Sequence, residues 1–352
     1  MNKKVKLLIV TQKVDENDDV LGFMHGWIKE FARQCEKVTV ICLYKGQYNL
    51  PENVKVLSLG KEDGVSRLKY FVRFYNYIWR ERKNYDNVFV HMNQVYVILG
   101  WKIWRLLGKK IGLWYAHGYV PFSLRLAEKP LHKIFTSTVS GFRLNSKKLH
   151  IVGQGIDTEI FAPINVKIEN DRLRIISIGR ISPVKNYETL IKAVEVLIKR
   201  GMKLEVNIIG GVGLPEQEQY LDVLKKMTKS KELESVIHFK GAVPNKDIIT
   251  VLQKSDLFVN TSLTGSLDKA MLEAMSIGLP TLTCNEAMLE VLGDYKRKLM
   301  YNKKDFEALA EKIVYIIGLN AKEKEKMSTD LRDIVVKDHS LPRFVKMILD
   351  NY

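Results

Sequence analysis

Two cationic side chains, Arg180 and Lys185, stand five positions apart on a short segment that joins an expected strand to an expected helix. The apolar run 175–178 is typical of a buried strand, and Asn186 is placed to cap a helix that begins near Tyr187. Helix N-terminal amides attract anions, and two cations can neutralise a diphosphate. The segment therefore indicates a phosphate site, although an ordinary strand-to-helix turn with two solvated charges fits it equally well.

A second stretch with the same strand–loop–helix layout begins at Ser255. An expected strand ends at 261–262, and a loop that contains Gly265 follows it. The next helix is expected to carry Lys269 in its first turn and Glu273 one turn later. This second stretch shifts the balance toward a binding site.

Patterns that alternate between strand and helix run along the whole chain and position these residues. They predict an α/β fold of two doubly wound domains, 1–163 and 172–339, joined by a polar linker, with a C-terminal helix at about 340–352 that packs back on the first domain. Two such domains leave a cleft, and ligands bind beyond the carboxyl ends of the strands. The expected strands are 5–11, 38–44, 54–59, 88–93, 111–118, 149–155, 174–179, 205–211, 236–241, 257–262 and 280–285, and the expected helices of the second half are 187–200, 216–230, 245–254, 268–277 and the region 304–350.

The net charge of +16 on 352 residues is concentrated in the first half of the chain. Residues 1–160 hold 26 Lys and Arg against 14 Asp and Glu, whereas residues 161–352 hold 30 against 26. This excess predicts an anionic partner, such as a phosphorylated substrate or a membrane surface. The charge is spread and no nucleic-acid-binding motif is visible, so we do not expect nucleic acid as a partner.

The cysteines and the N-terminus indicate the compartment. Cys35, Cys42 and Cys284 lack the spacing of a metal site and are typical of buried thiols in a reducing compartment. The first apolar run, 7–10, is far shorter than a signal-peptide core, and no apolar run approaches a membrane span. We therefore expect a cytoplasmic protein.

Two segments rich in aromatic and basic residues, 68–85 and 101–110, leave two interpretations open. The favoured one is a helix that packs on the sheet through an apolar stripe. The other is a helix that lies at a lipid interface, where aromatic and basic residues mix. The stripe is Leu68, Phe71, Val72, Tyr75, Ile78 and Trp79, and the cations beside it or at its end are Lys69, Arg73, Arg80, Arg82 and Lys83.

Three stretches together resemble glycosyltransferase family 4, retaining enzymes of the GT-B fold: GRISPVKN at 179–186, HIVGQGIDTEIFAP at 150–163, and the stretch from Ser255. The pattern L-E-A-M-x-x-G-L-P followed by E-V-L-G is specific in combination with G-R-x(4)-K. The resemblance covers nearly the whole second half, whereas the first half matches mainly in layout and in the pair His117–Gly118. It implies two Rossmann-like domains that face a cleft.

The resemblance implies roles for single residues. Arg180 and Lys185 would hold the donor's diphosphate. Glu273 would hold the nucleotide ribose, a task that suits a carboxylate because it accepts two hydroxyl hydrogen bonds. His117, at the end of an expected strand, would lie near the reacting carbon of the sugar, and it counts with Arg180 and Lys185 as catalytic.

The chain departs from the family at Gly265, where the first acid of the Glu-x(7)-Glu motif is expected. That acid normally positions the donor sugar, so its loss puts this contact in doubt. Asp268 and Lys269 are candidate substitutes, Asp268 on the sugar hydroxyls and Lys269 near the phosphate. A helix N-cap for Asp268 and a solvated Lys269 fit the sequence equally well.

Further donor-binding residues follow from the resemblance. Gly179 ends the strand before the cationic loop, and the resemblance includes a glycine turn behind the nucleotide. The loop 12–22 would face the cleft, but the family's glycine pair is reduced there to Gly22. The chain lacks a G-x-G-x-x-G fingerprint, which argues against a dinucleotide cofactor. The glycine turn is Gly210 and Gly211, and the residues expected to flank the base are Val243 and Pro244.

The sequence thus predicts a retaining, metal-independent hexosyltransferase with a UDP- or GDP-linked sugar as donor and no other cofactor. The expected acceptor is a carbohydrate or a lipid-linked molecule for surface polysaccharide or glycolipid. An anionic membrane surface is a further expected partner, with the protein peripheral on the inner face of the plasma membrane. The alternatives are a sugar-nucleotide epimerase of the same fold and a non-catalytic nucleotide-sugar-binding protein.

Overall fold

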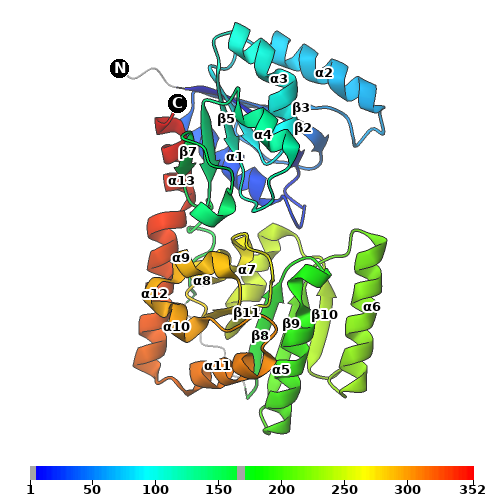
Figure 1. Cartoon of the computed structure of the whole chain (residues 1–352), viewed down its shortest axis with the longest axis vertical. Coiled ribbons are helices and arrows are strands. Elements are labelled where there is room, and N and C mark those ends of the chain that lie inside the picture. Colours follow the sequence, from blue (N-terminus) through cyan, green and yellow to red (C-terminus); the bar gives the residue numbers. More distant parts are fainter. Residues whose placement is uncertain (1–4, 165–170) are drawn as a thin grey trace. The chain divides into compact units, whose positions relative to one another are not determined.

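The computed structural model describes residues 5–164 and 171–352, so residues 165–170 of the expected linker lie outside the described part. The chain divides into two compact units, each built on one parallel sheet (Figure 1). Unit 1 comprises Met1–Gly155, Pro244–Lys246 and His339–Tyr352, and unit 2 comprises Ile156–Val243 and Asp247–Asp338.

Unit 1 is a three-layer α/β/α structure. Its seven strands lie in the order β3-β2-β1-β4-β5-β6-β7, all parallel. Alternate residues of β1 face opposite layers: Leu7 packs with α1 and α13, whereas Leu8 packs with α2, α3 and α4. The strands are β1 (Lys6–Val14), β2 (Lys37–Lys45), β3 (Val54–Ser58), β4 (Asn87–His91), β5 (Lys110–Trp114), β6 (Lys133–Thr136) and β7 (Leu149–Ile151), and the helices are α1 (Phe23–Gln34), α2 (Arg67–Arg80), α3 (Gln94–Leu106), α4 (Phe122–Glu128) and α13 (Leu341–Asp350).

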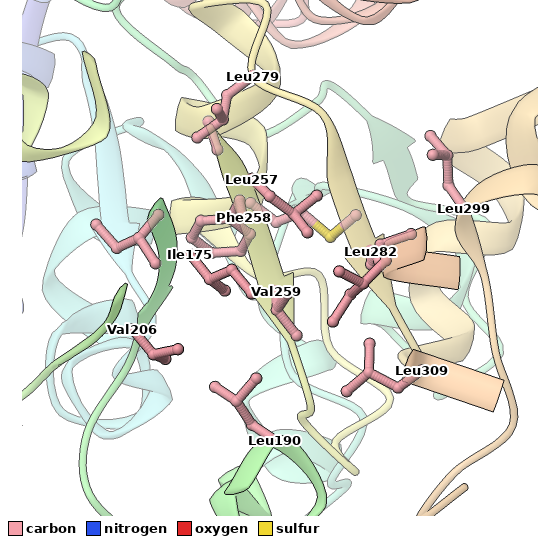
Figure 2. Packing of buried hydrophobic residues seen from close by; sticks show 14 of the residues in the cluster. Ile175, Leu190, Val206, Leu257, Phe258, Val259, Leu279, Leu282, Leu299 and Leu309 are labelled. Atoms are coloured by element: carbon pink, nitrogen blue, oxygen red, sulfur yellow. The ribbon is translucent and has the colours of Figure 1, made fainter. Parts of the chain in front are cut away.

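Unit 2 has five parallel strands in the order β10-β9-β8-β11-β12. Figure 2 shows its core, where Ile175, Leu257 and Leu282 from three neighbouring strands meet Leu190 and Leu309 from two helices. Each of these side chains is fully buried and contributes about 1.5–3 kcal/mol to folding. The strands are β8 (Leu173–Ile178), β9 (Leu204–Ile209), β10 (Ile237–Gly241), β11 (Leu257–Asn260) and β12 (Thr281–Thr283), and the helices are α5 (Tyr187–Lys199), α6 (Pro215–Ser230), α7 (Asn245–Gln253), α8 (Lys269–Ser276), α9 (Leu289–Leu292), α10 (Lys296–Leu299), α11 (Phe306–Gly318) and α12 (Ala321–His339).

Some elements of unit 1 differ from their prediction. Strand β1 continues to Val14, past the expected end at residue 11, because it stays paired with β2 up to Lys45. The sequence did not predict β6 or α4, which are short elements. Within the described residues, no helix is long and apolar enough to cross a membrane.

The helix expected in 68–85 does pack on the sheet, as favoured, but mostly through residues outside the expected stripe. Helix α2 buries only Phe74 and Ile78, and Phe74 was not part of the stripe. The rest of the stripe is exposed, because the residues that meet the sheet lie on a neighbouring face of the helix.

The expectation of buried thiols holds for the three cysteines, and burial raises the pKa of the Cys35 and Cys42 thiols to about 12.

Candidate donor-binding site

The candidate site lies where the strand order of unit 2 changes direction. Strand β8 pairs with β9 on one side and with β11 on the other, so the chain segments that leave β8 and β11 emerge next to each other. Parallel α/β sheets bind ligands at this kind of position, beyond the carboxyl ends of the two strands. The two stretches that the sequence singled out follow β8 and β11.

The segment after β8 is a tight turn. Pro183–Lys185 form one turn of 3-10 helix, and Asn186 then takes a left-handed conformation with φ of 49° before α5 begins. Asn186 occupies the N-cap position as expected, but its side chain accepts no bond from a helix amide. Its amide nitrogen instead donates to Thr189 Oγ1 at 2.6 Å. The first amides of α5 are therefore not capped by this side chain.

Backbone contacts join the two stretches. The hydroxyl of Thr261 donates to the carbonyl oxygen of Lys185 at 2.5 Å, and the amide of Leu263 donates to the carbonyl oxygen of Val184 at 2.9 Å. The loop after β11 thus fixes the turn that carries Lys185. Residues far apart in the sequence form one structural assembly at this edge of the sheet.

The side chain of Lys185 is held by Asp268. Lys185 Nζ lies 2.5 Å from Asp268 Oδ2, and both side chains are largely buried. Asn260 Nδ2 donates to the same carboxylate oxygen at 2.9 Å. Asp268 stands at the N-cap position of α8, but its side chain caps no helix amide, so the N-cap interpretation of its role is wrong. Its carboxylate instead orients a cation.

Lys269 and Glu273 lie one turn apart on α8. Glu273 is 4% exposed, in the middle of a helix whose other buried residues are mostly apolar. Burial lowers the pKa of Lys269 to about 8, and the nearby charge of Glu273 opposes this shift. Lys269 is partly buried rather than fully exposed, which does not fit its interpretation as a solvated lysine. A partly buried cation and a buried carboxylate stand in the first two turns of α8.

Arg180 has a different environment from Lys185. Its side chain is exposed, and it makes no hydrogen bond or ion pair with any residue in 5–164 or 171–352. It is therefore available to bind an anion without first breaking a contact within the described chain. Lys185, in contrast, must share its charge between Asp268 and a ligand.

Two glycines allow the ends of β8 and β9 to approach closely. A Cβ atom on Gly210 would lie 1.9 Å from the carbonyl oxygen of Gly179, so no other residue fits at position 210 without a shift. The carbonyl oxygen of Gly179 also accepts a hydrogen bond from the Tyr187 hydroxyl at 2.7 Å. Gly211 accepts a backbone bond from Ile181 at 3.0 Å. This packing fixes the backbone next to Arg180.

Three further predicted donor-binding residues, Gly265, Val243 and Pro244, lie in the segments that follow strands β11 and β10. Gly265 lies in the partly buried loop between β11 and α8, near the start of the helix but without a side chain that could replace the expected acid. Val243 is partly buried against the core of unit 2 after β10. Pro244 follows it and is grouped with unit 1.

Two further predicted residues, Gly22 and His117, belong to unit 1. His117 is exposed in the segment after β5, and its Nδ1 accepts a bond from the amide of Tyr119 at 3.0 Å. Gly22 stands at the N-cap position of α1, where a Cβ would lie 2.4 Å from the carbonyl oxygen of Asp18. Both follow the carboxyl end of a strand in the unit 1 sheet.

The sequence did not single out Asn260 or Thr261 as site residues. Asn260 is 3% exposed, and its Oδ1 accepts bonds from the Ser262 amide and from Thr283 Oγ1, each at 3.2 Å. These bonds fix the amide so that its nitrogen faces Asp268. A signal was present in the sequence, because the apolar run of β11 ends abruptly in Asn-Thr-Ser.

Part of the chain is similar in sequence to known glycosyltransferases. Residues 160–332 match the family model of glycosyl transferases group 1. WcaL of Escherichia coli (strain K12), named as a colanic acid biosynthesis glycosyltransferase, is 24% identical over 216 residues, which are 59% of this chain and 52% of WcaL. The mannosylfructose-phosphate synthase of Agrobacterium fabrum (strain C58 / ATCC 33970) is 29% identical over 154 residues, 41% of this chain and 34% of the synthase. The chain thus spans about half, or less, of the length of these curated relatives.

The fold has solved counterparts. The structure of Anabaena Alr3699/HepE in complex with UDP and glucose has a TM-score of 0.75 at 14% identity, over 98% of each chain. Two parallel-sheet, Rossmann-like units of this kind define the GT-B class of α/β folds. The match of residues 160–332 to the model of the group 1 glycosyl transferases agrees with the resemblance found in the motifs of the chain.

Proposed function

We propose that this protein is a retaining glycosyltransferase that moves a sugar from a UDP- or GDP-linked donor to an acceptor hydroxyl. The observation that carries this proposal is the pair of cations after β8, with Lys185 held 2.5 Å from Asp268 and Arg180 exposed, beside the buried Glu273 of α8. The match of residues 160–332 to the model of the group 1 glycosyl transferases supports it.

The chemistry follows from charge. In the reaction the bond between the anomeric carbon and the diphosphate breaks, and the acceptor oxygen bonds to the same face of that carbon. The departing diphosphate gains negative charge and takes the hydroxyl proton. Arg180 and Lys185 would stabilise this charge in the transition state, together with the helix dipole of α5, without a metal ion or other cofactor. Glu273 would bind the ribose hydroxyls, and His117 would contact the sugar or the acceptor.

Because Gly265 stands where the resemblance expects the first acid of the motif, another residue is needed to position the donor sugar. Asp268 is the carboxylate nearest in the sequence to Gly265, and its engaged oxygen already accepts bonds from Lys185 and Asn260. We assign Asp268 to the positioning of Lys185, with its remaining oxygen available to a sugar hydroxyl. Lys269 is placed to add positive charge at the start of α8.

The acceptor is proposed from charge and from the names of relatives. WcaL is named for colanic acid biosynthesis, CapM of Staphylococcus aureus is named for capsular polysaccharide biosynthesis, and HepE was solved with UDP and glucose. We propose that the acceptor here is a carbohydrate or a lipid-linked molecule for surface polysaccharide or glycolipid. The basic first half of the chain suits an anionic acceptor on the inner face of the plasma membrane, where the protein would be peripheral.

A panel of nucleotide sugars tests the proposal. Binding of one donor raises the melting temperature through linkage, and release of free nucleoside diphosphate on addition of acceptor distinguishes a transferase from a sensor that only binds. A product with an inverted sugar centre and no transfer would instead support the epimerase alternative. Failure of every UDP- and GDP-linked sugar to raise the melting temperature would contradict the proposed donor.

A further inference from the structure

Helix α2 in unit 1 has an apolar face that the rest of the described chain leaves largely exposed. The helix is amphipathic, and its buried side is formed by Phe74 and Ile78. Two of the residues on the open side, Leu68 and Val72, are 74% and 62% exposed. We call this open side the α2 face; it consists of Leu68, Phe71, Val72, Tyr75 and Trp79.

The α2 face is one continuous stripe. Its members follow the spacing i, i+3, i+4, i+7 and i+11, which at 3.6 residues per turn confines them to about 100° of the helix circumference. Monomeric proteins rarely leave so many large apolar side chains together in water. The stripe is therefore typical of a surface that binds a partner.

The orientation of the stripe is fixed by the rest of unit 1. The Tyr77 hydroxyl donates to the carbonyl oxygen of Ser58 at 3.1 Å, and Arg73 Nη1 donates to the carbonyl oxygen of Leu59 at 3.0 Å. At the end of the helix the buried Glu81 binds Lys55 at 2.8 Å. These contacts hold α2 against β3 and the residue after it, so α2 cannot turn its open face inward without breaking them. On its other side α2 lies beside α3 (Figure 1).

The surroundings of the α2 face are cationic. Residues 67–80 contain four Lys and Arg and no Asp or Glu, and residues 94–106 of α3 contain two Lys and Arg and no acid. Arg82 follows the helix, and its guanidinium lies 4.7 Å from the ring centre of Trp79. Exposed cations of the helix stand directly next to the stripe at Arg67, Lys69 and Arg80.

Charge decides between partners for this face. A second copy of the chain would bring the same cations against one another in a symmetric interface, which repels. A nucleic acid would meet the cations but not the row of Leu, Phe and Val side chains. An anionic bilayer matches both features, because the apolar side chains enter the acyl boundary, the Tyr and Trp rings lie at the interface, and the cations reach lipid phosphates.

We infer that the α2 face is the surface by which this protein docks on an anionic lipid bilayer. This inference rests on the part of the proposed function that gives the enzyme a membrane-associated acceptor. It adds to that proposal the helix, the side chains and the orientation of unit 1 that make the contact. The catalytic candidates after β8 and β11 are on other elements, so docking and donor binding can be measured separately.

Co-sedimentation of the full chain with vesicles tests the inference. Phosphatidylcholine vesicles with added phosphatidylglycerol should bind the protein at low salt, whereas phosphatidylcholine alone should not, and added salt should weaken binding. The triple variant Leu68→Ser, Val72→Ser and Trp79→Ser should bind at least tenfold more weakly. Replacement of Arg67, Lys69 and Arg80 by Glu should abolish binding.

Helix α6 supplies matched controls, because it is exposed and belongs to unit 2. Val223→Ser removes an exposed apolar side chain there, and replacement of Lys225, Lys226 and Lys229 by Glu makes the same change of charge. Both variants should bind vesicles as the wild type does. An equal loss of binding in the α6 charge variant would overturn the inference, because net charge alone would then explain the effect.

Two further results would overturn the docking inference. Absence of binding to anionic vesicles at low salt overturns the inference, and so does a dimer in sedimentation equilibrium that Trp79→Ser dissociates, because a second copy would then cover the face. Every α2 variant should keep its affinity for UDP or GDP. A protein that binds vesicles through α2 but binds no nucleotide supports the docking surface and contradicts the proposed function.

Discussion

Lys185 Nζ and Asp268 Oδ2, from residues 83 positions apart in the sequence, lie 2.5 Å from each other at the junction of β8 and β11. The pair is largely buried and is completed by Asn260, which donates to the same carboxylate oxygen. A diphosphate that binds here must compete with Asp268 for the charge of Lys185. Asp268 therefore fixes the position of the Lys185 ammonium group and partly neutralises its charge.

Removal of the Asp268 charge should strengthen binding of nucleoside diphosphate. Asp268→Asn keeps the shape of the side chain, frees the charge of Lys185 and removes an anion from the site. We expect the Kd for UDP or GDP to fall about tenfold, roughly 1.4 kcal/mol, as measured by calorimetry. Asp222→Asn on the exposed surface of α6 is the control. Unchanged or weaker binding in Asp268→Asn would mean that the carboxylate does not compete with the ligand.

Loss of the Glu273 charge should have the opposite effect on binding. Glu273→Gln keeps the volume of a buried side chain but weakens the acceptor for the ribose hydroxyls, a charge-assisted contact of about 1.5–3 kcal/mol. The Kd for the free nucleoside diphosphate should rise by at least about tenfold. Glu218→Gln on α6 should leave it unchanged. If Glu273→Gln binds as tightly as the wild type, the ribose lies elsewhere.

The close approach of β8 and β9 predicts a contrast between two glycines. Gly210→Ala places a Cβ 1.9 Å from the carbonyl oxygen of Gly179, so the backbone next to Arg180 must shift. We expect a loss of stability of roughly 1–3 kcal/mol in urea unfolding and weaker donor binding. Gly213→Ala, whose nearest atom would be 3.8 Å away, should change neither. Equal effects at both positions would rule out the packing explanation.

The partly buried Lys269 predicts a dependence of stability on pH. Its pKa is about 8 in the folded protein, lowered by burial from the ordinary value of 10.5. Between these values the unfolded chain keeps a proton that the folded protein has lost. The unfolded state then binds more protons, so this group makes the free energy of unfolding rise with pH across that window, by about 1–3 kcal/mol.

Lys269→Arg tests this dependence, because a guanidinium does not titrate in the same range. Urea unfolding at several pH values should show a smaller rise with pH in Lys269→Arg than in the wild type, and other titrating groups cancel in the comparison. Identical slopes in the two proteins would show that Lys269 keeps an ordinary pKa in the folded state.

Much of the fold and part of the site could be predicted from the sequence, for identifiable reasons. Strands of a parallel sheet are continuous apolar runs, so 174–179 and 257–262 stood out, and Arg180 and Glu273 follow such runs. The contact between Lys185 and Asp268 could not be predicted, because it depends on which strands are neighbours. Sheet order is set by packing between distant segments, and one sequence does not show it.

Helix α2 illustrates a second limit. Its apolar residues cover a wide arc, so the helical period was correct while the side that meets the sheet was not. Phe74 and Ile78 are buried in the layer beside β1 and β4, with Tyr70 and Tyr77 partly buried against it. Side-chain bonds to the carbonyl oxygens of Ser58 and Leu59 fix the rotation of the helix. Those bonds come from a strand end that the helix pattern does not reveal.

The rate of nucleoside diphosphate release, with a donor identified by thermal shift and an acceptor present, tests the central claim most directly. Arg180→Ala and Lys185→Ala should each lower this rate by about 30-fold to 1,000-fold, the equivalent of roughly 2–4 kcal/mol of transition-state stabilisation, while their urea midpoints stay close to the wild type. Lys226→Ala on α6 should turn over normally. Rates near the wild type in both Arg180→Ala and Lys185→Ala would contradict the assignment of this site to the donor's diphosphate.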